Sequence, residues 1–202
     1  MATKSVSVKF VTPATSEWMF CYVNAFEPKA FENQAPKYSV CVLIPKSDEA
    51  GLAAFKVAYE KCKEANKAML ANANGVVPAT FKNPVLKDGD EAVANGAGEE
   101  FAGHWFFNAS ATVKNNPNGI MVWDKSGKTL DATEFYSGCK GRISGNFFAY
   151  NTGTAKGISF GLGALCKTAD GENNFSGSNS SASDFGISPF DSSTKNDEET
   201  DF

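Results

Sequence analysis

Residues 135–151 read FYSGCKGRISGNFFAYN and alternate between apolar and polar side chains, as a half-buried β-strand does. The odd positions carry mainly apolar side chains: Phe135, Cys139, Ile143, Phe147 and Ala149. The even positions interleave cations, aromatic rings and small polar groups: Tyr136, Lys140, Arg142, Ser144, Asn146, Phe148 and Tyr150. We predict a strand with one face in a core and the other exposed. Glycines at 138, 141 and 145 are typical of a bent barrel strand that another backbone can approach closely.

The exposed face of this strand has the chemistry that binds unpaired nucleic acid. Lys140 and Arg142 supply cations for phosphates, and Tyr136, Phe148 and Tyr150 supply flat rings. Stacking on such rings contributes about 1–3 kcal/mol per base and needs no sequence code. The pattern fits equally well an ordinary exposed strand whose aromatic rings pack under a loop.

Strand patterns recur on both sides of this segment. We expect strands over 5–11, 18–26, 37–45, 104–114, 120–124, 134–151 and 156–167. One helix is expected after Ser47 as N-cap, with its apolar side chains at helical spacing, and it should end at Asn74-Gly75. Residues 75–103 have the Pro and Gly content of a loop. This order predicts a mainly β protein with a five-stranded barrel of the oligonucleotide/oligosaccharide-binding (OB) type and one helix, although an open α+β sheet gives a similar string.

The charge is unevenly distributed along the 202 residues. The whole chain has a net charge of −4, which argues against a nucleic-acid partner. Residues 184–202 contain six acids and one base, however, so residues 1–183 carry a net charge of +1. From about Ala169 the sequence is rich in Ser, Gly, Asn and Asp, which is typical of disorder. We predict a binding domain over 1–168 and a flexible acidic tail over 169–202.

Several other features carry little chemistry. The five cysteines lack a Cys-x-x-Cys pair and are expected to be buried thiols, without a metal or a disulfide framework. Gly127-Lys128-Thr129 lacks the earlier glycine of a phosphate-binding loop, and His104 has no local partners for a catalytic triad. Asp88-Gly89-Asp90 fits a turn better than a calcium loop. With no apolar run long enough for a membrane span or a signal peptide, a soluble cytoplasmic protein is expected.

The chain resembles a family of single-stranded DNA-binding proteins from tailed bacteriophages. The resemblance rests on several ordered blocks: residues 36–40, 81–84, 88–90, 103–110, 135–151 and 156–162. It implies an OB-fold barrel that coats single-stranded DNA during phage replication, in the host cytoplasm and without catalysis. The chain departs from the family at Asn115, Asn116 and Asn118, where relatives tend to be more basic.

We therefore expect a non-enzymatic protein that binds single-stranded DNA without sequence preference. The expected DNA contacts are Tyr136, Lys140, Arg142, Phe148, Tyr150, Phe106, Lys114 and Trp123. The tail ends in an acidic run closed by an aromatic, which fits docking to phage or host replication proteins: Asp197, Glu198, Glu199, Asp201 and Phe202. No cofactor, metal or membrane partner is expected, and the chain is a monomer or a homodimer.

Two other functions fit the same pattern less well. An OB barrel can also serve as a protein-interaction or carbohydrate-binding module, and a nuclease with an unrecognised carboxylate site is a third alternative.

Overall fold

The computed structural model describes residues 5–30 and 34–171, and within them the protein is mainly β. Its strands are β1 (Val8–Val11), β2 (Trp18–Lys29), β3 (Lys37–Pro45), β4 (Lys87–Asp88), β5 (His104–Thr112), β6 (Met121–Trp123), β7 (Lys140–Asn151) and β8 (Lys156–Ala169). Its helices are α1 (Glu49–Ala65), α2 (Lys67–Leu70) and α3 (Gly89–Ala94), with 3-10 turns η1 (Glu99–Phe101) and η2 (Val113–Asn115). The predicted mainly β class is confirmed, but the described residues contain three helices where one was expected. Residues 172–202 of the predicted tail, which was placed at 169–202, lie outside the described residues, while Ala169 is the last residue of β8.

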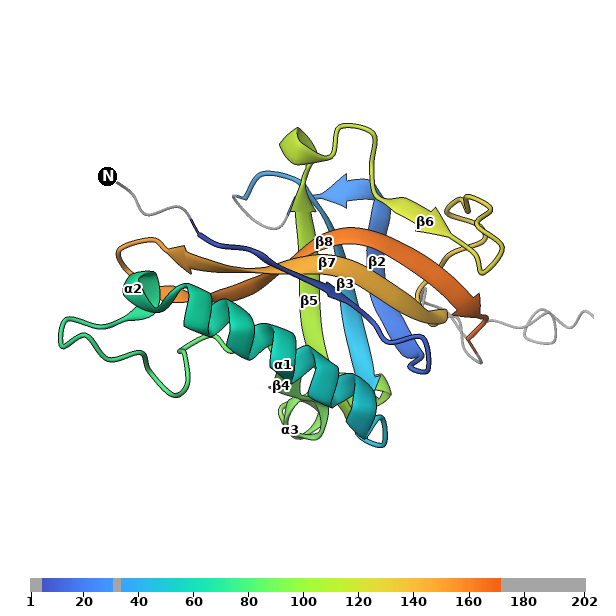
Figure 1. Ribbon diagram of the computed structural model, residues 1–202. Coiled ribbons are helices and arrows are strands. Elements are labelled where there is room, and N and C mark those ends of the chain that lie inside the picture. Colours follow the sequence, from blue (N-terminus) through green and yellow to red (C-terminus); the bar gives the residue numbers. More distant parts are fainter. Residues whose placement is uncertain (1–4, 31–33, 172–202) are drawn as a thin grey trace, which may run out of the picture.

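The strands pair in a circuit that closes on itself. The order β7-β2-β3-β5-β8 returns to β7, because β7 and β8 also pair directly, and β1, β4 and β6 attach to this circuit. The circuit is uneven. β7 and β8 form a long antiparallel hairpin, whereas β5 meets β8 only through the parallel pairs Ala109–Phe160 and Ser110–Gly161. Figure 1 shows β7 and β8 as the long diagonal ribbons that cross in front of β3 and β5.

The core lies inside this circuit and is strongly aromatic. Phe147 and Phe160 face each other across β7 and β8, with ring centroids 4.9 Å apart, and both are fully buried. Phe55 of α1 packs edge-on against Phe147 at 4.9 Å, which joins the helix to the sheet. Edge-to-face pairs of this kind add to the free energy of burial. The expected alternation of β7 is confirmed, since Ile143, Phe147 and Ala149 are buried.

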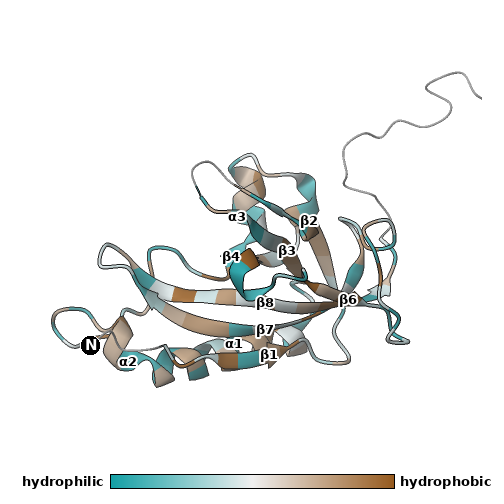
Figure 2. Ribbon diagram, turned by 90° about the horizontal axis from the view of Figure 1, so that it is seen from above, coloured by the Kyte–Doolittle hydropathy of each residue, from teal (hydrophilic) through white to brown (hydrophobic). Residues whose placement is uncertain are grey.

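Helix α1 lies along one side of the sheet, beneath β1 and β7, and α3 lies on the other side near β2 and β3 (Figure 2). Asp48 is the N-cap, where Ser47 was expected, and its Oδ1 accepts a hydrogen bond from the Gly51 N–H at 2.9 Å. The predicted helix end at Asn74-Gly75 is wrong. Helix α1 ends at Ala65, because Asn66 turns its side chain into hydrogen bonds with Val6 and Cys62.

The expected strand over 134–151 also needs a correction, since β7 begins only at Lys140. Residues before it form turns: the Phe135 N–H donates to Asp131 O, and the Cys139 N–H donates to Tyr136 O. Gly138, with a φ of 109°, breaks the strand. Phe135 is nevertheless buried, so its apolar character was interpreted correctly while its place in the strand was not.

The segment expected to be a plain loop, 75–103, instead places α3 and η1 over the outer face of the sheet. Phe101 packs there against Phe106 at 4.8 Å and joins a second apolar cluster with Cys21, Cys41 and Leu43. Asp88-Gly89-Asp90, which was expected to be a turn, instead ends β4 and begins α3, with Asp88 as the N-cap of the helix. Lys46 anchors this segment to the end of β3, because its Nζ lies 2.7 Å from the Asp88 carboxylate and 2.6 Å from that of Asp90. In the described part of the chain, no helix is long and apolar enough to cross a membrane.

Candidate nucleic-acid interface

A groove runs beside the outer face of β7 and β8. It has a volume of about 520 Å³ and is walled by the two strands on one side and by the ends of β5 and η2 on the other. Phe148 is 37% exposed and lines it together with Tyr150. A Cβ on Gly157 would come within 2.7 Å of the Tyr150 hydroxyl, so this glycine leaves the space that the ring occupies. Two predicted contact residues thus meet in one groove.

The wall of this first groove opposite β7 carries polar side chains from β5, η2 and the start of β3, including Lys37, Ser110 and Asn116. Of the described residues that line it, Lys37 is the charged one. The groove therefore offers two rings and one cation to a ligand.

A second groove of about 720 Å³ continues over the outer face of β2, β3 and β5. Lys37 and Ser110 line both grooves, so the two meet at the start of β3. The charged residues among its described lining residues are Lys29 and Lys37. A cationic channel without a described acidic wall residue attracts a phosphate backbone.

The floor of the second groove is made of small polar side chains. Ser39 of β3 is paired with Ser110 of β5, and Cys41 with Asn108, so these side chains point to the same outer face. Asn24 of β2 donates from Nδ2 to Ser39 Oγ at 3.2 Å. Short side chains allow a bound base or sugar to come close to the sheet, and their amides and hydroxyls can hydrogen-bond to it.

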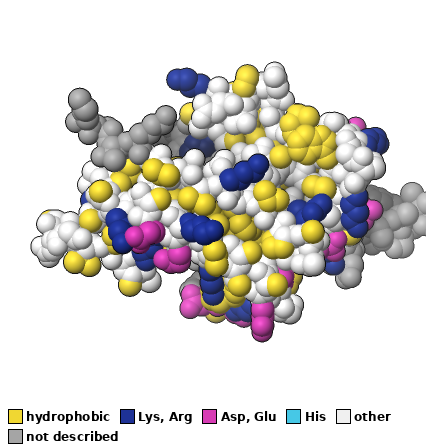
Figure 3. All heavy atoms as spheres, in the orientation of Figure 1, with side chains coloured by type: hydrophobic (Ala, Val, Ile, Leu, Met, Phe, Trp, Pro, Cys, Tyr) yellow, Lys and Arg dark blue, Asp and Glu magenta, His cyan; other side chains and the backbone are white. Residues whose placement is uncertain are grey.

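Figure 3 shows the face of the molecule on which α1 lies. Dark-blue side chains are spread over this face, and magenta ones lie among them in its lower half. This face therefore has no uniform charge, in contrast to the lining of the second groove, where the charged residues are Lys29 and Lys37.

Arg142 and Trp123 lie in a separate row on the sheet. Arg142 of β7 is paired with Cys166 of β8, and Cys166 is paired in turn with Trp123 of β6. Both predicted contact residues are half-buried. Arg142 precedes Phe148 by six residues, about 20 Å along an extended strand. The structure therefore brings these two residues together but sets them apart from the groove at Phe148.

Lys140 is the first residue of β7, and Tyr136 lies in the turn before it. The Tyr136 hydroxyl donates to the Asp170 carboxylate at 3.0 Å, and Lys167 Nζ lies 5.0 Å from the centre of its ring. The hydrogen bond to Asp170, with a contribution from burial, raises the pKa of Tyr136. Lys140 is paired with Ala169 near the end of β8. In this structure the Tyr136 side chain is thus held by Lys167 near the end of β8 and by Asp170 directly after it.

Phe106 and Lys114 are placed differently from one another. Phe106 is half-buried in the second apolar cluster, between Phe101 and Lys87, whose Nζ lies 5.7 Å from the ring centre. It lines neither groove among the described contacts. Lys114 is exposed in η2, next to Asn115, which lines the first groove. Lys114 is thus near a groove, while Phe106 supports the sheet from outside.

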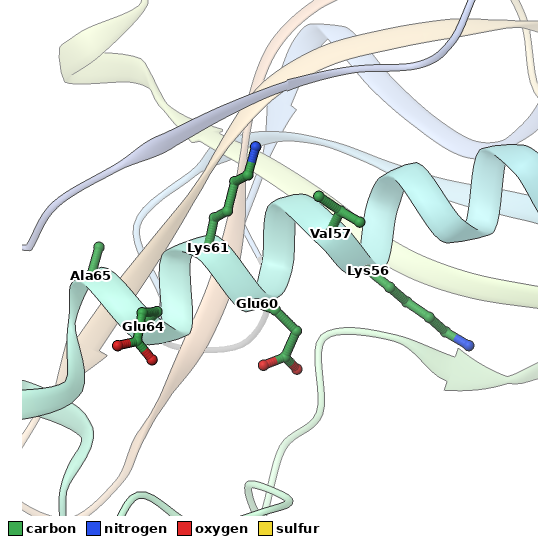
Figure 4. Close-up of a pocket in the computed structure, with 6 residues that line it drawn as sticks. All are labelled: Lys56, Val57, Glu60, Lys61, Glu64 and Ala65. Carbon is green, nitrogen blue, oxygen red and sulfur yellow. The ribbon is translucent and has the colours of Figure 1, made fainter.

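A further hollow lies on the outer face of α1 (Figure 4). It is lined by Lys56, Val57, Glu60, Lys61, Glu64 and Ala65. Its two lysines and two glutamates cancel in charge, so it gives no preference to a phosphate. Within residues 5–30 and 34–171, no cluster of three His, Cys, Asp or Glu side chains could hold a metal ion.

The two grooves contain residues that the sequence patterns did not single out: Tyr22, Asn24, Lys29, Lys37, Ser39 and Ser110. A signal for some of them was present at the start of β3, where Lys37 and Ser39 alternate with the buried Tyr38 and Val40. The same alternation that identified the outer face of β7 identifies this second outer face. The alternation does not show, however, which strands are neighbours in the sheet.

The fold and its grooves define a class of protein, a small β protein with a cationic and aromatic surface suited to single-stranded nucleic acid. The chain belongs to the family described as "Enterobacter phage Enc34, ssDNA-binding protein", whose model matches residues 13–202. The resemblance to phage single-stranded DNA-binding proteins is therefore confirmed. No curated protein matches the chain.

Solved structures of phage proteins share the fold. The single-stranded DNA-binding protein of bacteriophage Enc34, in complex with ssDNA, has a TM-score of 0.64 and 21% identity over 87% of this chain and 95% of its own. The gp2.5 protein of bacteriophage T7, a single-stranded DNA-binding protein, has a TM-score of 0.58 and 16% identity over 97% of this chain and 100% of its own.

Proposed function

We propose that this protein binds single-stranded DNA without sequence preference, along the two joined grooves. The observation that carries the proposal is their meeting at Lys37 and Ser110, which makes one path from Phe148 and Tyr150 to Lys29. Cations along the path neutralise phosphates, and rings stack on bases. Family membership and the ssDNA complex of the Enc34 protein support this function.

We assign the closed circuit of β2, β3, β5, β7 and β8 to an OB-type barrel. The parallel contact between β5 and β8 and the direct pairing of β7 with β8 are consistent with a partly open five-stranded barrel. Barrels of this type bind oligonucleotides on the outer face of their second and third strands, here β3 and β5. The second groove lies on that face.

The predicted contacts divide into three groups under this proposal. Phe148 and Tyr150 stack on bases in the first groove, with Lys114 beside it. Arg142, Lys140 and Trp123 extend the surface along β7 and β6, and Tyr136 contacts DNA once its ring is released from Lys167. Phe106 keeps the second apolar cluster in place, and its contribution to DNA binding is indirect.

Binding of this kind protects and organises single strands during phage DNA replication and recombination, in the cytoplasm of the host. We propose that the protein catalyses no reaction and needs no cofactor. The acidic tail, ending at Asp201 and Phe202, recruits phage or host replication proteins and competes with DNA for the cationic grooves.

An oligo-dT titration tests the function. Trp105 and Trp123 are half-buried and Trp18 is buried, so binding should change the fluorescence mainly of the first two. If about four phosphates are neutralised, log K should fall with log salt with a slope near −3. An affinity that does not depend on salt would contradict DNA binding and favour a protein-interaction or carbohydrate-binding module. Degradation of end-labelled DNA in magnesium would contradict the assignment as a non-enzyme.

A further inference from the structure

Tyr22 of β2 has an unusual backbone conformation. Its φ is +50°, and it is the one non-glycine residue with a positive φ in the described part of the chain. Residues with a Cβ seldom adopt the left-handed region, and an aromatic residue has none of the local hydrogen bonding that makes it easier for Asn or Asp. Such strain persists only where surrounding contacts impose it, and it is concentrated at binding sites.

Three side-chain hydrogen bonds impose this conformation. The pairing of β2 with β3 shifts its register between Cys21 and Asn24, so Tyr22 lies in a bulge. The Val23 N–H donates to Ser137 Oγ at 3.1 Å. The buried Asn24 donates from Nδ2 to Tyr22 O at 3.1 Å and to Ser39 Oγ at 3.2 Å. The bulge is therefore tied to β3 and to the turn before β7.

The bulge places the Tyr22 ring outside the sheet, where it is 59% exposed. One face of the ring is backed by Phe101, with centroids 6.3 Å apart and an angle of 22° between the planes. The hydroxyl donates to Glu100 Oε1 at 3.0 Å. Phe101 itself is held against Phe106 at 4.8 Å. Tyr22 is thus an exposed ring with a fixed orientation.

The segment 88–103, which carries Glu100 and Phe101, is itself anchored. Lys46 binds the carboxylates of Asp88 and Asp90, and Asp90 Oδ1 accepts a hydrogen bond from the Gly103 N–H at 2.7 Å. These contacts fix both ends of the stretch that carries Glu100 and Phe101. An aromatic ring fixed before binding loses less conformational entropy when it stacks on a ligand.

Tyr22 lines the second groove, the same groove as Lys29 and Lys37. The carboxylate of Glu100 next to the ring repels phosphates, while the two lysines attract them. A single DNA strand bound in the groove is therefore oriented with its phosphates toward Lys29 and Lys37 and with a base toward Tyr22. An aromatic ring without the lysines would not distinguish a nucleic acid from an apolar ligand.

We propose that Tyr22 is a base-stacking residue that receives an unpaired DNA base at the Glu100 side of the second groove. This assignment rests on the proposed function and adds a contact on β2, outside the β7 and β8 surface. The strained bulge positions the ring, and Phe101 supports it from behind.

Replacing Tyr22 tests the assignment. Tyr22→Ala should weaken oligo-dT binding by about 5-fold to 150-fold, the range measured for losing one base stack. Tyr22→Gly should weaken it equally, because glycine also removes the ring, yet it accommodates the positive φ and should unfold at a higher temperature than Tyr22→Ala. Tyr22→Phe keeps the ring and loses only the bond to Glu100, so its affinity should remain within about 3-fold of wild type.

Val57→Ala is the matched control, since Val57 is 54% exposed on α1 and lies outside both grooves. A base analogue such as 2-aminopurine in the oligonucleotide reports stacking directly through quenching of its fluorescence. Quenching should decrease in Tyr22→Ala and persist in Tyr22→Phe. Wild-type affinity and quenching in Tyr22→Ala and Tyr22→Gly would overturn the assignment, while failure of the wild-type protein to bind DNA would overturn the proposed function as well.

Discussion

Arg142 on β7 and Trp123 on β6 are both paired with Cys166 of β8, one on each side of it. In a sheet, residues in one cross-strand row project to the same face. A guanidinium and an indole therefore share the outer face of β8, separated by one short side chain. A phosphate bound by Arg142 would place its nucleotide near Trp123.

Arg142→Ala should weaken oligo-dT binding and reduce the slope of log K against log salt by less than one unit, because one phosphate contact is lost. The change in Trp123 fluorescence on binding should also decrease. Lys61→Ala on the outer face of α1 removes the same charge away from the grooves, and it should leave the slope unchanged. Equal slopes for the two variants would exclude Arg142 from the DNA path.

Phe148→Ala should reduce affinity by about 5-fold to 150-fold through the loss of one base stack in the first groove. The ring is 37% exposed, so the free energy of unfolding should change less than for removal of a buried phenylalanine. Titration with oligo-dT and urea denaturation measure the two effects. If Phe148→Ala lowers stability by as much as Phe147→Ala while affinity stays the same, the ring has a packing role only.

Deleting residues 184–202 removes a net charge of −5. If this segment competes with DNA for the cationic grooves, the truncated protein should bind oligo-dT more tightly at low salt. The difference should diminish at high salt, since screening weakens both interactions. Binding of replication proteins should be lost at the same time. Unchanged affinity at low salt would contradict the competition and leave the recruitment proposal to be tested separately.

The sequence predicted the outer face of β7 well because alternation is a local property. Lys140, Arg142 and Phe148 project outward as the period of two requires, and Phe147 is buried. The alternation does not apply to Tyr136, since the chain turns at Gly138 before the strand begins. A glycine with positive φ cannot be distinguished by alternation from a glycine inside a bent strand.

The second groove could not be predicted in the same way because it depends on strand pairing. Its floor combines Asn24, Ser39 and Ser110 from three strands, whose proximity follows from register. The exposure of Tyr22 could not be predicted for a different reason, because a bulge reverses the side of the sheet to which the following residues point. The short helix α3 and the η1 turn were also missed, because Gly and Pro in 75–103 indicate a loop and the fastening contacts of Lys46 are long-range.

Asp48 predicts a dependence of stability on pH. Burial raises the pKa of Asp48, but hydrogen bonds from Trp18 Nε1 and the Gly51 N–H outweigh burial and leave it below its usual value. A lowered pKa in the folded state stabilises the fold above the unfolded pKa of about 3.9, and this contribution disappears as the pH falls through the folded pKa. Asp48→Asn retains a capping oxygen but does not titrate. Below about pH 4 its free energy of unfolding should therefore fall less steeply with decreasing pH than that of the wild type. Parallel pH profiles of urea denaturation would contradict this role.

Gly145 permits the close approach of β7 to β8. A Cβ there would lie 2.2 Å from Gly161 O and 2.4 Å from the Phe160 ring, whereas a Cβ on Gly161 would meet nothing nearer than the Phe148 ring at 3.5 Å. Gly145→Ala should therefore lower the free energy of unfolding by about 1–3 kcal/mol, because the backbones must separate. Gly161→Ala, on the neighbouring strand, should cost much less. Urea denaturation of both variants measures the difference, and equal losses would show that β7 and β8 can separate at Gly145 without disturbing the core at Phe160.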